Sequence, residues 1–114
     1  MKTGAELIAD ERKRQIEVEG YTEQHDYEHS VREFISAAIS YSHTALTNAI
    51  REEYHVTSSD ENDALDSVIK GMGKTFVWGE KAFKSTTCLC DLVKAGALIA
   101  AAIDRLKLKQ STTT

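Results

Sequence analysis

The chain has 114 residues, of which 41% are hydrophobic, 28% charged and 7% aromatic, and its formal net charge is −4. This length fits a single domain, residues 1–114, with one core. No apolar run approaches the length of a membrane span, and a net negative surface argues against a sequence-independent grip on duplex nucleic acid. The first ten residues become charged without an apolar signal core, so we expect a cytoplasmic protein.

Charge is distributed unevenly along the chain. Residues 1–30 carry four basic and eight acidic side chains, whereas residues 64–114 carry eight basic and four acidic ones. Two interpretations stay open. The oppositely charged halves attract each other within the fold or across an oligomer interface, or the basic stretch Lys70–Lys84 receives an anion.

The absence of proline and the helical spacing of hydrophobic residues predict an all-α fold, a small helical bundle of three to four helices. Thr3 and Glu6 have the spacing of a capping box. We therefore expect a first helix from about residue 4 to Glu19, ending at Gly20, the usual residue for a left-handed C-terminal cap.

A second helix is predicted over residues 31–50, because Ser30 and Glu33 repeat the capping-box spacing. Residues 51–63 lose the periodicity and are expected to form a polar loop, and the spacing of Ser58 and Glu61 then predicts a short helix through Leu65, Val68 and Ile69. The second helix should bury a stripe of apolar and small residues: Val31, Phe34, Ile35, Ala38, Ser42, Ala45, Leu46, Ala49 and Ile50.

The segment 71–84, GMGKTFVWGEKAFK, combines glycines, lysines and aromatic residues without clear periodicity, and we expect an ordered loop with a short turn or strand. GMGKT resembles the end of a phosphate-binding P-loop but fails the test, since Val68 stands where the first glycine belongs. Two alternatives remain: the lysines and rings grip a nucleotide by charge and stacking, or the aromatic rings plug one end of the bundle.

The last helix is expected over residues 88–107. Its residues Leu92, Gly96, Ile99, Ile103 and Leu106 recur at steps of four and three, typical of the seam of a close helix pair within the chain or with another copy. We therefore predict a homo-oligomer. The nearby pair Cys88 and Cys90 has no second pair in the chain, so no structural metal site is expected.

The first helix contains a polar interruption. Arg12 lies one turn beyond Ile8 on the same helix face, so it either reaches the helix edge and pairs with a carboxylate, or lines a polar pocket with Glu11 and Gln15 where its guanidinium holds an anion. The connector that follows contains His25 and His29, whose spacing is only a weak metal signal before a helix start.

Two blocks, ERKRQIEVEGYTEQHD over residues 11–26 and DLVKAGALIAAAIDRL over residues 91–106, resemble a widespread family of small phage and prophage proteins. The chain departs from that family at Ala102, where relatives often carry an acid, and in its aromatic loop, where they carry a proline-containing, tryptophan-rich stretch. The matching positions are Glu11, Arg12, Arg14, Gln15, Glu19, Gly20, Tyr21, His25, Asp26, Lys94, Gly96, Asp104 and Arg105.

The resemblance implies a phage accessory protein in the cytoplasm of the host cell, and three functions compete. The first is capture of a small anionic ligand, such as a nucleotide signal of host defence. The second is inhibition of a host factor through protein contact, and the third is metal-dependent nucleotide pyrophosphate hydrolysis, which needs clustered helical carboxylates. We expect no cofactor, and the predicted ligand-binding residues are Glu11, Arg12, Arg14, Gln15, Tyr21, His25, Asp26, Lys94 and Trp78.

Overall fold

The computed structural model describes residues 1–18 and 30–112, with side chains to residue 108. These residues form four α-helices and one short 3-10 helix without any strand, so the predicted all-α fold is confirmed. Within these ranges no helix is both long and apolar enough to cross a membrane. In chain order the elements are α1 (Gly4–Glu17), α3 (Val31–Glu53), α4 (Ser59–Lys74), the 3-10 helix η1 (Glu80–Ala82) and α5 (Cys88–Thr112).

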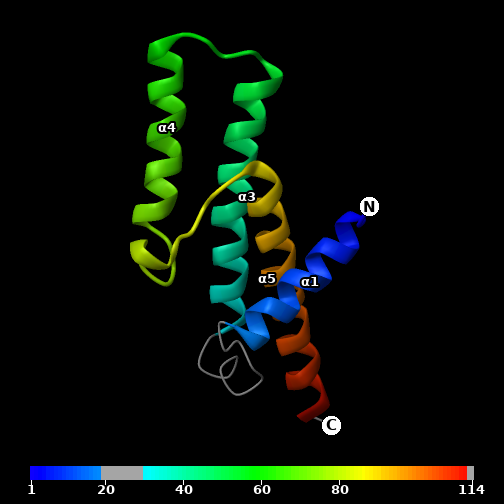
Figure 1. Cartoon of the computed structure of the whole chain (residues 1–114). Coiled ribbons are helices and arrows are strands. Elements are labelled where there is room, and N and C mark those ends of the chain that lie inside the picture. The colour runs from blue at the N-terminus through cyan, green and yellow to red at the C-terminus, as the bar shows by residue number, and fades with distance from the viewer. Residues whose placement is uncertain (19–29, 113–114) are drawn as a thin grey trace.

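The centre of the fold is an antiparallel pair formed by α3 and α5 (Figure 1). The first helix, α1, crosses α5, and α4 lies beside α3 on the side away from α5. The segment between α4 and α5 returns across α3 and carries η1. We call the part of this segment that follows α4, residues 75–84, the aromatic loop. The return brings it to the same side of the central pair as α1.

Both predicted capping boxes are confirmed. In each box the hydroxyl of Thr3 or Ser30 accepts a hydrogen bond from the backbone N–H three residues later, and the glutamate at that position accepts one from the cap's own N–H. These bonds satisfy backbone donors that have no partner within the helix. At its other end α1 stops at Glu17 rather than Glu19, and the predicted stop at Gly20 lies outside the described residues.

The polar loop is shorter than predicted, because the helices on both sides extend into it. Helix α3 continues to Glu53, and α4 begins at Ser59, directly after Ser58, whose hydroxyl accepts a hydrogen bond from the Glu61 N–H as their spacing predicted. Arg51 in the last turn of α3 donates to Asp66 of α4, with 2.6 Å between Nη2 and Oδ1. This ion pair joins the two helices at the point where the predicted loop was to begin.

The prediction that residues 71–74 belong to a loop is wrong, because α4 continues to Lys74. Gly73 is buried, and a Cβ added to it would lie 3.2 Å from Cδ2 of Phe83. This glycine therefore permits close packing rather than a turn. Since residues 71–74 are helical, this segment does not form a glycine-rich loop that could wrap a phosphate.

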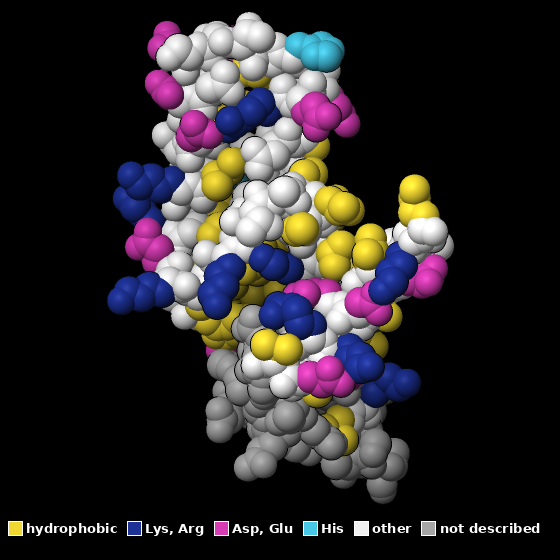
Figure 2. All heavy atoms as spheres, in the orientation of Figure 1, with side chains coloured by type: hydrophobic (Ala, Val, Ile, Leu, Met, Phe, Trp, Pro, Cys, Tyr) yellow, Lys and Arg dark blue, Asp and Glu magenta, His cyan; other side chains and the backbone are white. Residues whose placement is uncertain are grey.

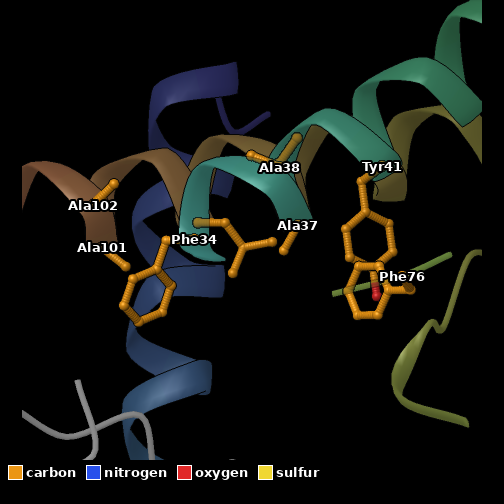
Figure 3. Close-up of a cluster of buried hydrophobic side chains, with 9 residues drawn as sticks. Phe34, Ala37, Ala38, Tyr41, Phe76, Ala101 and Ala102 are labelled. Atoms are coloured by element: carbon orange, nitrogen blue, oxygen red, sulfur yellow. The ribbon is translucent and has the colours of Figure 1, made fainter. Parts of the chain in front are cut away.

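The core lies between α3, α5 and the aromatic loop. Phe34 and Tyr41 project from α3 towards the loop, and Phe76 lies against Tyr41 (Figure 3) with ring centroids 5.5 Å apart. Trp78 meets Phe34 edge to face at 5.6 Å, and Phe83 stacks on Tyr41 at 4.9 Å. The rings thus pack along one side of α3, between Phe34 and Tyr41, rather than closing one end of the bundle. The remaining buried residues of this cluster are Ala37, Ala38, Ala95, Leu98, Ala101 and Ala102.

The final helix, α5, runs to Thr112, five residues beyond the predicted end. Of its predicted seam, Gly96 meets α1: a Cβ on Gly96 would lie 2.5 Å from Cδ1 of Ile8. The other seam residues are 43–51% exposed: Leu92, Ile99, Ile103 and Leu106. The glycine therefore lets α1 cross closely over α5, while the aliphatic part of the seam faces outward.

Candidate functional site

A pocket of about 400 Å³ lies where α1, α3, α5 and the aromatic loop meet. This volume falls in the range of small-molecule sites in proteins. In Figure 2, Lys and Arg side chains gather around hydrophobic atoms in the middle of the face that carries α1. The pocket is lined by Glu11, Arg14, Gln15, Tyr41, Phe76, Trp78, Ala82, Lys84, Thr86, Lys94 and Leu98.

Helix α1 contributes a carboxylate that is held by hydrogen bonds. Arg14 donates to both oxygens of Glu11, at 2.7 and 2.8 Å, and Gln15 donates to the same carboxylate at 3.3 Å. The hydrogen bonds and charge of Arg14 lower the pKa of Glu11 against the opposing effect of burial, with smaller contributions from Gln15 and Lys94. Glu11 is therefore ionised at neutral pH and balances one positive charge of the pocket.

Gln15 is the buried polar residue of this wall, with only 3% of its surface exposed. Its amide nitrogen donates to Glu11, which leaves the carbonyl oxygen Oε1 on the other side of the amide. Among the described residues Oε1 is buried without a hydrogen-bond partner. A buried acceptor is costly when no donor reaches it, and a ligand N–H or O–H group would supply that donor.

The opposite wall is cationic and is fixed by the backbone of the loop. Lys94 of α5 donates through Nζ to the carbonyl oxygen of Lys84, and it lies 5.5 Å from the centre of the Tyr41 ring. Tyr41 in turn accepts a hydrogen bond from the backbone N–H of Lys84 at 3.0 Å. Both polar groups of the Lys84 backbone are thereby held, one by α5 and the other by α3.

Asp91 positions the rest of this wall without lining the pocket. Its carboxylate is fully buried and accepts hydrogen bonds from the Ser85 hydroxyl at 2.7 Å and from the Thr86 N–H at 3.1 Å. Buried carboxylates are costly unless they are bonded in this way. Asp91 therefore holds the segment before α5 against the first turn of that helix. The bond to the Thr86 N–H fixes the position of Thr86 in the pocket wall.

A second, more apolar pocket of about 310 Å³ adjoins the first and shares Glu11, Thr86 and Lys94 with it. It also contains Cys90, whose thiol is exposed. Hydrogen bonds from Thr87 and Thr86 lower the pKa of Cys90. Neither cysteine forms a disulfide.

The structure separates the predicted site residues into three groups. Five of them line the pocket together: Glu11, Arg14, Gln15, Trp78 and Lys94. Arg12 does not line it; its side chain turns to α5 and lies 3.5 Å from the carboxylate of Asp104, as the carboxylate-pairing interpretation expected. The predictions for Tyr21, His25 and Asp26 fall outside the described residues.

Sequence reasoning missed several lining residues, above all Tyr41, Thr86 and Leu98. Tyr41 had a signal, since it is the one large aromatic residue in the middle of a helix otherwise rich in alanine and serine. Lys84 and Phe76 lie in the segment 71–84, for which the sequence allows either nucleotide binding or aromatic packing. Nothing in the sequence around Thr86 indicates a site residue, because its position in the pocket wall depends on the hydrogen bond from its N–H to Asp91.

Compared with known protein families, curated proteins and solved structures, the chain has no match. Across residues 1–18 and the described part from residue 30 onward, no group of three His, Cys, Asp or Glu side chains is arranged to hold a metal ion.

Proposed function

We propose that this chain binds a small anionic ligand of the nucleotide class in the pocket between α1, α5 and the aromatic loop. The observation that carries the proposal is the combination of three cationic side chains with aromatic rings around one cavity. Arg14, Lys84 and Lys94 outnumber the single acid, Glu11, so the wall keeps a positive excess. Phosphate groups favour such cations, and bases favour aromatic walls.

The buried acceptor on Gln15 favours a nucleotide over a simple inorganic anion. Phosphate at neutral pH offers chiefly acceptor oxygens, which do not satisfy a carbonyl oxygen. A nucleobase has N–H donors on its edge, and a ribose has hydroxyl donors. A ligand that places one of them at Oε1 would complete the hydrogen bonding of Gln15 while its phosphate meets Lys84 or Lys94.

We further propose that the protein acts as a phage accessory protein in the cytoplasm of the host cell, where it would sequester a nucleotide signal of host defence. The resemblance of residues 11–26 and 91–106 to small phage proteins supports this role. In the fold the described part of the first block, residues 11–18, meets the second block, because Arg12 lies 3.5 Å from the carboxylate of Asp104 and both blocks contribute side chains to the pocket. Because side chains of both blocks line the pocket, binding of a ligand there would involve both blocks.

Trp78 provides the test, since it is the only tryptophan of the chain and lines the pocket. We expect its fluorescence to change on titration with mono-, di- or cyclic nucleotides, and to respond far less to pyrophosphate or to an uncharged nucleoside. Lys94→Gln should weaken nucleotide binding about tenfold by removing one charge-assisted contact. Lys70→Gln on α4 is the matched control and should bind like the wild type, because Lys70 does not line the pocket.

A second variant separates base recognition from phosphate recognition. Gln15→Leu removes the buried acceptor and replaces it with an aliphatic side chain of similar size. It should reduce nucleotide affinity while leaving the weak response to pyrophosphate unchanged. The absence of any saturable response across the nucleotide panel would contradict the proposal.

The competing functions give different outcomes in the same titration. A nucleotide pyrophosphate hydrolase would release pyrophosphate when Mg²⁺ is added, whereas a capture protein returns its ligand intact. An inhibitor that works by protein contact alone would leave Trp78 fluorescence unchanged with every nucleotide.

A further inference from the structure

The central helix pair exposes many aliphatic side chains. Nine large ones on α3 and α5 are 37–61% exposed; one of them, Leu89, lines the second pocket. We call the other eight the aliphatic face: Ile35, Ile39, Leu46, Ile50, Leu92, Ile99, Ile103 and Leu106. Single exposed apolar residues are normal, but contiguous groups of this kind mark interaction surfaces. The outward stripe of α5 has the step pattern of a helix-pair seam, and Gly96 of that seam meets α1.

The two stripes lie on the same side of the helix pair. On α3, Tyr41 faces the pocket, and on α5, Lys94 and Leu98 face it. At about 100° per residue, the exposed positions lie on the flank of each helix that turns away from this pocket. The aromatic loop covers the pocket side, so the aliphatic face turns away from the loop, and on α5 it borders the line along which α1 crosses Gly96.

The stripe on α3 is symmetric about the point between Ser42 and His43. Ile35 and Ile50 lie equally far from that point, and so do Ile39 and Leu46. Continuing outward, the next equidistant positions on the same side hold opposite charges, Arg32 and Glu53, both exposed. A two-fold axis through this point would therefore match aliphatic with aliphatic and cation with anion.

We propose that the occupant of the aliphatic face is a second copy of this chain, with the two α3 helices packed antiparallel about a two-fold axis at Ser42 and His43. Ile35 then meets the partner's Ile50, and Ile39 meets the partner's Leu46. Arg32 pairs with the partner's Glu53 at each end. A two-fold interface needs this self-complementarity, because every contact occurs twice.

The exposed aliphatic residues of α5 form the outer part of the proposed interface, beside the pair of α3 helices. Since α5 runs antiparallel to α3 on the same side, its aliphatic residues extend the buried surface beyond the α3 pair. The result is a bundle of four long helices, two from each copy, with apolar residues inside. Because the aliphatic face turns away from the aromatic loop, each copy keeps its own site open to solution.

Sedimentation of the full chain tests the proposal. The wild type should sediment as a dimer, and Ile39→Glu should raise the dimer dissociation constant about tenfold or more, since it places a charge at the centre of the apolar contact. Ile39 is 59% exposed in the single chain, so the variant should keep its helical circular dichroism. Val68→Glu, at a half-exposed site on α4, is the matched control and should remain dimeric.

A charge exchange tests the axis without altering the apolar surface. Arg32→Glu and Glu53→Arg should each weaken the dimer, and the double variant should restore it, because the pair is re-formed with reversed signs. In a background with Cys88 and Cys90 replaced by serine, Ser42→Cys should cross-link two copies on oxidation. A monomer at all concentrations, or a dimer that survives Ile39→Glu unchanged, would overturn the proposal. Trp78 titrations on the same variants keep this outcome separate from that of ligand binding.

Discussion

Glu11 is the one acid among the charged side chains that line the pocket. Its carboxylate is engaged on both oxygens by Arg14 and Gln15, so it offsets one cation and leaves the other two in excess. The same contacts mean that the Glu11 carboxylate contributes to the free energy of unfolding, and this contribution depends on pH. Because they lower its pKa in the folded state, its contribution is complete above the ordinary glutamate value of about 4.3 and is lost as the pH falls through the lowered value.

Glu11→Gln should therefore destabilise the protein at pH 7 by about 1–2 kcal/mol, since it keeps the shape but removes the charge that Arg14 meets. The deficit should shrink as the pH is lowered from about 5 to 3, where the wild-type carboxylate also becomes neutral. Urea denaturation of both proteins across this range measures the difference and cancels the titration of the other acids. A deficit that stays constant down to pH 3 would contradict the account.

At the same scale, sequence reasoning found the polar residues of the site better than the apolar ones. Glu11, Arg14 and Gln15 were recognisable because they follow one another in a polar interruption of a helix. Tyr41 was missed, since the predicted stripe of α3 merged two faces. Phe34, Ala38 and Ala45 of that stripe are buried, whereas Ile35, Leu46 and Ile50 are exposed.

At the scale of elements, the crossing of α1 over α5 assembles the site. The crossing depends on Gly96, because even a single added carbon would overlap the side chain of Ile8. Closely packed helices resist such additions. The sequence pointed to Gly96 as a place of close approach, but it did not reveal which helix approaches, since spacing along one helix carries no information about its neighbour.

Gly96→Leu should destabilise the protein by about 1–3 kcal/mol and should also weaken nucleotide binding, because displacing α1 moves Glu11 and Gln15 from the pocket. Gly71→Leu is the matched control in α4, where an added Cβ meets nothing within 4 Å. That variant should be neutral or slightly stabilising, since glycine is a poor helix former. Thermal melts and Trp78 titrations measure both effects. Equal melting temperatures for the two variants would contradict the proposed role of Gly96.

The error in α4 has a physical origin at this scale too. Glycines in the segment 71–74 were interpreted as loop signals, because glycine is unfavourable inside helices. The segment is nevertheless helical, and the ring of Phe83 packs closely against the buried Gly73. Local propensity is a weak guide wherever a tertiary contact of this kind compensates for it.

For the whole molecule, the central pair α3 and α5 carries two surfaces of different chemistry. One is the cationic, aromatic pocket beneath α1, and the other is the aliphatic face. The all-α class was predictable from periodicity and capping boxes. The pocket was not, because it forms only where residues far apart in the chain, such as Gln15, Tyr41 and Lys94, are brought together.

Nuclear magnetic resonance can map whether a nucleotide occupies the proposed pocket, residue by residue. A labelled chain of 12.7 kDa is suited to recording amide and side-chain shifts during a nucleotide titration. We predict that the largest changes fall on the Gln15 side-chain amide, the Trp78 indole N–H and the backbone of Lys84 and Thr86. Saturable changes confined to α4 or to the aliphatic face, or no changes at all, would contradict the account.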